Sequence, residues 1–197
     1  MTQKPGRVWL VRHGATEWSE SGKHTGNTDV TLLESGEAAA RALAPLLAEQ
    51  SFALALSSPL IRARRTAELA GLHPEITDDL REWDYGEYEG RTTAEIRQDA
   101  PDWTIFSDGA PNGELAGEVA ARVDRVIERA REAATSGQDV VCVAHGHVLR
   151  VLGVRWVEMA PEDGRHFKLG TAALCILGYE HEHPAIELWN DTSYVPD

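Results

Sequence analysis

The sequence is poor in cysteine and has no long apolar run. Only two of its 197 residues are cysteines, Cys142 and Cys175, and both stand inside short apolar stretches. Buried, inert thiols are typical of that setting, and two such residues give no disulfide framework. Disulfides are rare in reducing compartments, so this composition predicts a cytoplasmic protein. No apolar run approaches the roughly 20 residues that a membrane-spanning helix needs.

Positive charge is also scarce, since 19 Lys and Arg face 32 Asp and Glu and the formal net charge is −13. An acidic chain of this kind argues against a nucleic-acid surface and against binding to acidic membranes. The first predicted strand begins soon after Met1, so we expect no signal peptide. An anionic substrate would need a local positive pocket, which the few arginines beside strand ends could form.

The order of apolar and amphipathic segments predicts an α/β fold. Apolar runs at residues 7–12, 52–57 and 139–144 are typical of buried strands. Strands that alternate with helices form βαβ units, so we expect a three-layer sandwich with a mainly parallel sheet and helices on both faces. The length fits one domain over residues 1–197. Helices are expected at residues 35–50, 59–72, 92–99, 114–134 and 148–159, and further strands at residues 75–77, 171–179 and 186–189.

Capping and breaking residues refine the expected helices. Ser35 is the expected N-cap of the helix that follows it, and Pro45 should kink or shorten that helix. Ser58 followed by Pro59 predicts a helix start that places Arg62 in the first turn. Polar or irregular composition predicts loops over three stretches: residues 17–34, 78–91 and 100–113.

Chemically useful side chains follow the apolar strands at the point where each strand ends. The first strand ends in Arg12 and His13, which Gly14 follows. The strand at residues 139–144 is followed directly by His145. If these strands are neighbours, both histidines meet at the carboxyl edge of the sheet, where open α/β sheets bind ligands. Arg62 reaches the same edge. With the partial charge of helix N-termini, these groups suit a phosphate dianion.

Four sequence blocks occur in the order found in one known family. They are Arg12-His13-Gly14 with Thr16, Ser58-Pro59-Leu60-Ile61-Arg62-Ala63 with Thr66-Ala67, Leu80-Arg81-Glu82 with Gly86 and Glu89-Gly90, and Ala144-His145-Gly146. In these blocks the chain resembles the histidine phosphatase superfamily, in its phosphoglycerate-mutase-like branch, from about residue 8 to residue 150. Residues 81–90, 103–114 and 145–147 resemble a narrower subgroup of bacterial broad-specificity acid phosphatases and fungal sedoheptulose bisphosphatases.

The resemblance implies a metal-independent phosphomonoesterase, without a cofactor, that acts on a small phosphorylated metabolite through a phosphohistidine on His13. Arg12, Arg62 and His145 would hold the three equatorial phosphate oxygens, and arginine and imidazolium would supply the positive charge. Glu82 would protonate the leaving alkoxide and then activate water. The resemblance also suggests a homodimer.

Four further residues are expected to touch the substrate: Ser19, Thr25, Gly26 and His147. Thr25 and Gly26 align with a family stretch that touches substrate. Ser19 stands where the mutases usually carry asparagine, and His147 replaces the asparagine that follows their His-Gly. A mutase must retain its phosphorylated intermediate, whereas a phosphatase only needs to admit water. These departures from the mutases favour hydrolysis.

Several alternatives stay open at the level of sequence. The chain could be a phosphoglycerate mutase, a non-catalytic module that binds a phosphorylated ligand or, more remotely, a metallohydrolase. His24 either lines the pocket or is a loop histidine, and His147 either contacts substrate or starts a helix. Three carboxylates compete with Glu82 as general acid: Asp84, Glu87 and Glu89. The segment His181-Glu182-His183 is expected at an exposed hairpin tip.

Overall fold

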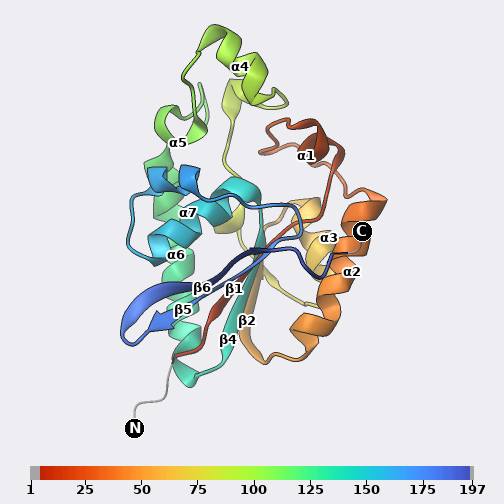
Figure 1. The fold of residues 1–197 in the computed structure, drawn as a ribbon, viewed down its shortest axis with the longest axis vertical. Helices are drawn as coiled ribbons and strands as arrows, with labels where there is room; N and C mark the ends of the chain where they lie inside the picture. The colour runs from red at the N-terminus through yellow and green to blue at the C-terminus, as the bar shows by residue number, and fades with distance from the viewer. Residues whose placement is uncertain (1–4, 196–197) are drawn as a thin grey trace.

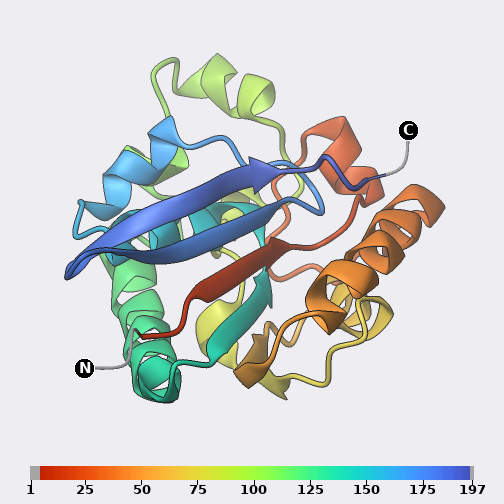
Figure 2. The same ribbon diagram turned by 60° about the horizontal axis from the view of Figure 1, so that its bottom comes forward.

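The computed structural model describes residues 5–195 and contains a single mixed sheet within that range. The strand order is β3-β2-β4-β1-β5-β6. Neighbouring strands from β3 to β1 are parallel, β5 is antiparallel to β1, and β6 is antiparallel to β5 (Figure 2). The expected mainly parallel sheet is therefore confirmed. The strands are β1 Val8–Arg12, β2 Phe52–Ser57, β3 Glu75–Ile76, β4 Asp139–Ala144, β5 Leu174–Glu180 and β6 His183–Asp191.

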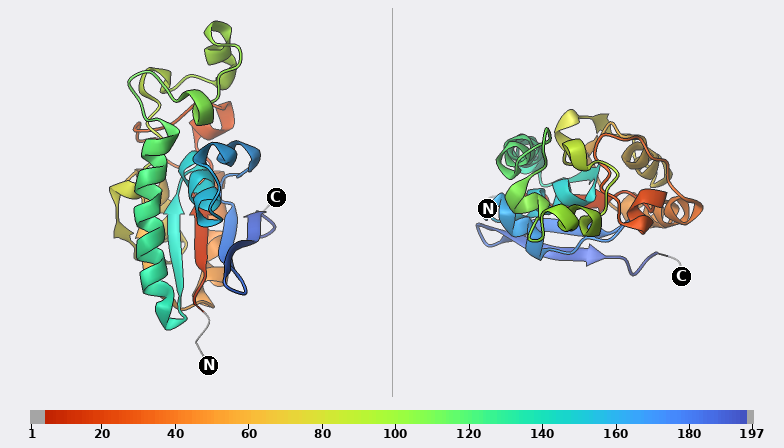
Figure 3. Two further views of the ribbon diagram at one scale, coloured as in Figure 1. Left: turned by 90° about the vertical axis from the view of Figure 1, so that its left-hand side faces the viewer. Right: turned by 90° about the horizontal axis from the view of Figure 1, so that it is seen from above.

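Helices cover both faces of the sheet, as Figure 1 shows with α6 and α7 on one side and α2 and α3 on the other. Figure 3 views the molecule from the side of α6 and α7. The α-helices are α1 Glu17–Ser21, α2 Glu34–Ala48, α3 Ile61–Leu69, α4 Thr93–Asp99, α5 Ile105–Asp108, α6 Ala116–Ala133 and α7 Gly146–Trp156. This arrangement confirms the three-layer α/β fold.

The alternation of side chains along β1 divides the core into two clusters. Val8 and Leu10 pack into the cluster that contains the apolar faces of α6 and α7. Trp9 and Val11 point the other way, into the cluster with Leu43 of α2 and the buried alanines of α3. Successive residues of a strand face opposite sides, so a continuous apolar run is what a strand covered on both faces requires.

The carboxyl ends of the parallel strands lie beneath the segments that carry α1, α4 and α5 (Figure 1). The residues that follow β1 and β4 are therefore brought to one edge of the sheet. Direct pairing of β1 with β4, with Arg12 opposite Ala144, places His13 and His145 next to each other. This confirms the expectation that the two strands are neighbours.

The start and the interior of α2 differ from expectation. The N-cap is Leu33, without a side-chain cap, and Ser35 already lies inside the helix. Pro45 neither kinks α2 visibly nor shortens it, because α2 runs on to Ala48. Proline inside a helix removes one backbone hydrogen bond, here the one to the Arg41 carbonyl. The buried residues Leu43 and Leu47, on either side of Pro45, anchor this turn to the core.

The expected start of α3 is also wrong, because the helix begins at Ile61 and not at Pro59. The Ser58 hydroxyl accepts from the Leu60 N–H and is hydrogen-bonded to Nε2 of His145, so it does not cap the helix. Arg62 nevertheless falls in the first turn of α3, as expected.

Two of the expected loops contain short α-helices, and the third, residues 78–91, contains 3₁₀ helices at Asp78–Leu80 and Gly86–Tyr88. In residues 17–34, α1 is closed by a capping box in which Thr16 and Ser19 bond reciprocally. In residues 100–113, α5 is capped by the Thr104 hydroxyl, which accepts from the Ser107 N–H. Both helices use the local hydrogen bonds that hydroxyl side chains make at N-termini.

The expected burial of the two cysteines and the expected hairpin tip are confirmed. Cys142 and Cys175 are buried, free thiols. His181 and His183 stand at the turn between β5 and β6, with side chains 81% and 78% exposed. Among the described residues, no helix is long and apolar enough to cross a membrane.

The two faces of α2 provide a matched test of the core. Leu43 is completely buried, whereas Leu46 is 37% exposed. We expect Leu43→Ala to lower the free energy of unfolding by about 3 kcal/mol, because it leaves a cavity. The same change at Leu46 should cost less than about 1 kcal/mol. Urea unfolding followed by circular dichroism measures both, and equal losses would contradict the packing described.

Candidate active site

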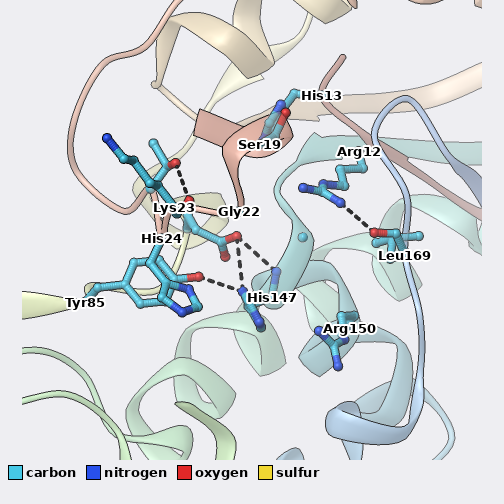
Figure 4. Close-up of a pocket in the computed structure, with 13 residues that line it drawn as sticks. Arg12, His13, Ser19, Gly22, Lys23, His24, Tyr85, His147, Arg150 and Leu169 are labelled. Atoms are coloured by element: carbon cyan, nitrogen blue, oxygen red, sulfur yellow. Dashed lines mark hydrogen bonds and ion pairs between the residues drawn. The ribbon is translucent and has the colours of Figure 1, made fainter. Parts of the chain in front are cut away.

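A pocket opens at the carboxyl edge of the sheet, beside the ends of β1 and β4 (Figure 4). It is lined by Arg12, His13, Ser19, Gly22, Lys23, His24, Thr25, Glu82, Tyr85, Gly146, His147, Arg150 and Leu169. Six of the predicted site residues are thus brought together on its wall. The other three, Arg62, His145 and Gly26, are buried behind it. Most of the side chains predicted from the sequence therefore converge on one cavity.

His13 is oriented for attack through Nε2. Its Nδ1 lies 2.7 Å from the carbonyl oxygen of Gly14. A carbonyl can only accept, so Nδ1 carries the proton and Nε2 of the neutral ring is left with a free electron pair. Burial, followed by the charges of Arg12 and Arg62, holds the pKa of His13 well below its ordinary value. The ring is therefore neutral and nucleophilic at physiological pH.

His145 lies directly beside His13, with ring centroids 5.1 Å apart. The Nε group of Arg62 donates to Nδ1 of His145 at 3.1 Å, so the His145 proton sits on Nε2 and points to the Ser58 hydroxyl at 2.7 Å. Burial and the charge of Arg62 hold the pKa of His145 well below its ordinary value. These contacts fit a neutral His145 ring, and the expected imidazolium charge beside a bound phosphate stays a prediction.

Arg62 is completely buried and makes four hydrogen bonds. Besides His145, its guanidinium donates to the backbone carbonyls of Thr25, Gly26 and Thr28, each at 2.9 Å. These bonds use four of its five N–H groups. Arg62 thus fixes the loop over the pocket and the orientation of His145.

Arg12 supplies positive charge on the pocket wall. Its Nη1 donates to the Leu169 carbonyl at 2.5 Å, while its buried Nε has no hydrogen-bond partner among the described residues. The guanidinium lies against the backbone of Gly146, where an added Cβ would come within 3.2 Å of the Arg12 Cζ atom. Glycine at this position therefore leaves room for Arg12 in the pocket.

Glu82 is held rigidly by backbone amides. Its carboxylate accepts from the N–H groups of Trp83, His147 and Val148, at 2.9, 3.0 and 2.9 Å. Two of these donors belong to the first turn of α7. The N-terminus of α3 is engaged in the same way, because the Ile61 N–H donates to Asp29. Carboxylates of the chain, and not open solvent, thus occupy the helix N-termini that were expected to add charge to the pocket.

Only one of the four candidate carboxylates faces the pocket. Asp84 accepts from the backbone of Gly86, and Glu89 accepts from Gly26. Glu87 is exposed and accepts from Asn112. Glu82 alone among them lines the cavity that contains His13. Within residues 5–195 no group of three or more His, Cys, Asp or Glu side chains is arranged to hold a metal ion.

Comparison with known proteins agrees with this geometry. The model of the histidine phosphatase superfamily (branch 1) matches residues 8–192. The chain belongs to this superfamily. It is 42% identical over 178 residues to an acid phosphatase of Mycobacterium tuberculosis, which covers 89% of this chain and 87% of that protein. It is 36% identical over 183 residues to sedoheptulose 1,7-bisphosphatase of Saccharomyces cerevisiae, over 76% and 67% of the two chains.

The fold of this histidine phosphatase also matches that of a solved structure. The structure of an open reading frame of Mycobacterium tuberculosis superposes with a TM-score of 0.90 at 39% identity, covering 94% of this chain and 97% of that one. These similarities confirm the family and the fold expected from the sequence. They also confirm the class of enzyme, a phosphatase that hydrolyses phosphomonoesters.

One wall of the histidine phosphatase pocket is built from three rings packed together, those of His24, Tyr85 and His147. The Tyr85 hydroxyl lies 2.6 Å from Nδ1 of His147, and His24 packs on Tyr85 with ring centroids 4.7 Å apart. Burial raises the pKa of Tyr85 well above its ordinary value, so this phenol keeps its proton. Both histidines whose location was left open line the pocket.

Five lining residues were not predicted: Gly22, Lys23, Tyr85, Arg150 and Leu169. Tyr85 lies inside the block that carries Glu82, so its position in that block was an available signal. Arg150 follows His147 by three residues on α7, and residues three apart share a helix face. Leu169 contributes from a distant segment, and no local pattern in the sequence marks it.

The burial of His24 in this wall of the pocket predicts how the ring titrates. Burial lowers the pKa of His24 from 6.5 to about 4. We expect its ring signal in proton NMR, assigned by its loss in His24→Gln, to titrate near pH 4. Because the folded state binds this proton less readily than the unfolded chain, the free energy of unfolding should decrease as the pH falls from about 6.5 to about 4.

The control for this titration is His181→Gln at the exposed hairpin tip. The decrease in unfolding free energy over that pH range should be smaller in His24→Gln than in wild type and should be unchanged in His181→Gln. A His24 midpoint at pH 6 or above would show that the ring is not buried as described.

Proposed function

We propose that this chain is a metal-independent phosphomonoesterase that hydrolyses small phosphorylated metabolites through a phosphohistidine at His13. The orientation of His13 carries the proposal. Its Nδ1 proton is committed to the Gly14 carbonyl, which leaves the electron pair on Nε2, and His13 lines a cavity that Arg12 and Glu82 also line. A nucleophile, a cation and an acid–base group within one pocket are what phosphoryl transfer requires.

In the first half of the proposed reaction, Nε2 of His13 bonds to phosphorus as the bond to the leaving oxygen breaks. Glu82 enters this half of the reaction protonated and gives that proton to the leaving alkoxide. In the second half, Glu82 takes a proton from water, the hydroxide attacks phosphorus, and the N–P bond returns its electron pair to His13. Arg12 would bind the phosphoryl oxygens from the pocket wall. Arg62 and His145 do not line the pocket, so Arg62 would act through its charge and His145 through its contact with the His13 ring.

Further parts of the proposal concern the substrate, the residues that contact it, and the location and oligomeric state of the enzyme. The names of the two relatives, an acid phosphatase and a sedoheptulose 1,7-bisphosphatase, support small phosphorylated metabolites as substrates. Ser19, Thr25 and His147 line the pocket and would contact the rest of such a substrate. Gly26 would act through its backbone, which bonds to Arg62 and Glu89. We also propose a single domain, a cytoplasmic location and a homodimer.

The role of His13 is tested by His13→Ala. Phosphate release is measured over a panel of phosphorylated metabolites, which includes 3-phosphoglycerate and sedoheptulose bisphosphate, in the presence of a chelator. Wild type should release phosphate from at least one of them despite the chelator. Loss of a covalent nucleophile should lower kcat/KM by a factor on the order of 1,000 or more.

Other outcomes separate the rival functions. Activity of His13→Ala within tenfold of wild type would remove the proposed nucleophile. Isomerisation of 3-phosphoglycerate that exceeds phosphate release would indicate a mutase. Tight phosphate binding with no turnover of any substrate would indicate a binding module, and activity abolished by the chelator would indicate a metallohydrolase.

The role of Glu82 is tested by Glu82→Gln. With an alkyl phosphate, whose leaving group needs a proton, kcat should fall by about 100-fold to 10,000-fold. With 4-nitrophenyl phosphate, whose leaving group needs none, His13 should still be phosphorylated but water attack should be slow. A burst of one nitrophenol per site, with accumulation of phosphohistidine, is the expected result in rapid-quench kinetics.

The matched control is Glu87→Gln, on the exposed carboxylate five residues away. It should show wild-type kcat and no burst. An alkyl phosphatase activity of Glu82→Gln close to that of Glu87→Gln would assign the acid–base role to another group.

A further inference from the structure

A second cavity adjoins the catalytic pocket. The two cavities share three lining side chains, His24, His147 and Arg150. The second cavity continues from them toward α4 and α5, where Trp103 and Phe106 form part of its wall. Figure 4 shows His13 and Arg12 toward one end of the catalytic pocket and His147 and Arg150 toward the other. A substrate whose phosphate lies at His13 could therefore extend past His147 into the second cavity.

The second cavity is lined by three arginines, Arg97, Arg150 and Arg165, and by no acidic side chain. This is a strong local concentration of positive charge in a chain with a net charge of −13. Within residues 5–195, none of the three arginines forms an ion pair. Most arginines that line no cavity near His13 are paired with carboxylates, so the three unpaired guanidinium groups stand apart.

Each of these arginines is held in place through Nε alone. Nε of Arg97 donates to the Trp103 carbonyl at 3.0 Å, and Nε of Arg150 donates to the Gly164 carbonyl at 2.9 Å. Nε of Arg165 contacts the ring of the neighbouring histidine at 3.1 Å. Among the described residues, no hydrogen bond engages their terminal Nη groups. Those Nη groups are the pair of donors with which arginine binds phosphate or carboxylate.

Arg150 is the most firmly positioned of the three. Its guanidinium lies over the ring of Phe106, 4.6 Å from the centroid, and is half-buried. Burial also lowers its pKa from the ordinary value, which reflects the loss of water around the charge. The charge of Glu82, which lines the catalytic pocket with Arg150, opposes this shift, but no carboxylate forms an ion pair with Arg150 among the described residues. A partly desolvated cation without an ion-pair partner gains stability when an anion binds.

We infer that the second cavity binds a second anionic group of the substrate, a phosphate or a carboxylate, through Arg150, Arg165 and Arg97. This inference rests on the proposed function, and it narrows the substrates to metabolites with a phosphate ester at one end and a further anion at the other. The rings between the two anion sites would contact the carbon chain or sugar that joins the two groups.

Two pairs of substrates that differ by one anionic group test the inference. Fructose 1,6-bisphosphate is compared with fructose 6-phosphate, and 3-phosphoglycerate with glycerol 3-phosphate. In at least one pair, the compound with the second anion should have a kcat/KM larger by about tenfold or more, the effect of one charge-assisted hydrogen bond. A preference in the first pair identifies a phosphate at the second site, and a preference in the second pair identifies a carboxylate.

The variants Arg165→Gln and Arg150→Gln should each lower that preference by about tenfold. Arg165 is exposed, so its replacement does not threaten folding even if loss of the contact between Arg150 and Phe106 does. Arg64→Gln, at an exposed arginine of α3 away from both cavities, is the control and should keep the wild-type preference.

Two results would overturn the inference. One is a wild-type kcat/KM that does not differ within either pair, and the other is an equal loss on both members of a pair in the variants. The same pairs are also compared by calorimetric binding to the His13→Ala enzyme. Tighter binding of the doubly anionic compounds to His13→Ala, together with no phosphate release by wild type from these four compounds or from the wider panel, would refute the proposed function and retain the second anion site.

Discussion

A guanidinium group without access to solvent joins three separate segments of the chain. Arg62, on α3, donates to carbonyls of the loop at residues 25–28 and to His145 at the end of β4. A buried charge is tolerated only when it is hydrogen-bonded and close to opposite charge, and Glu82 is the largest carboxylate influence on Arg62. The loop, the helix and the strand end are therefore fixed relative to one another. The position of His13 is fixed in turn, because its ring packs beside the ring of His145.

The arginines of the pocket keep free donors because the neighbouring carboxylates are engaged by backbone amides. Glu82 accepts amides of the first turn of α7, and Asp29 accepts an amide of the first turn of α3. Helix N-termini carry partial positive charge, so these carboxylates are stabilised without forming an ion pair with an arginine. Arg12 and Arg150 consequently keep donors available inside the cavity. The charge that a substrate meets in the pocket therefore depends on which charged side chains have partners there, and not on the net charge of the chain.

The sequence predicted the features that depend on short stretches and missed those that depend on distant contacts. Apolar runs that end in Arg12-His13 and in His145 mark strand ends directly. The capping box of α1 escaped notice because Ser19 stands at the position where such boxes usually carry Glu or Gln. The effect of Pro45 depends on how the flanking leucines pack, which a local rule does not contain. The burial of Arg62 behind the pocket wall depends on the path of a loop more than thirty residues earlier.

The use of arginine and not histidine for positive charge at this site follows from the needs of the nucleophile. An anion bound beside a histidine ordinarily raises the pKa of the ring, and a protonated His13 could not attack phosphorus. Arg12 and Arg62 act in the opposite direction, and together with burial they hold the pKa of His13 well below 6.5. Guanidinium groups keep their charge throughout the physiological pH range, so this effect persists in mildly acidic solution. The same charges that attract the phosphate therefore keep Nε2 of His13 free to react with it.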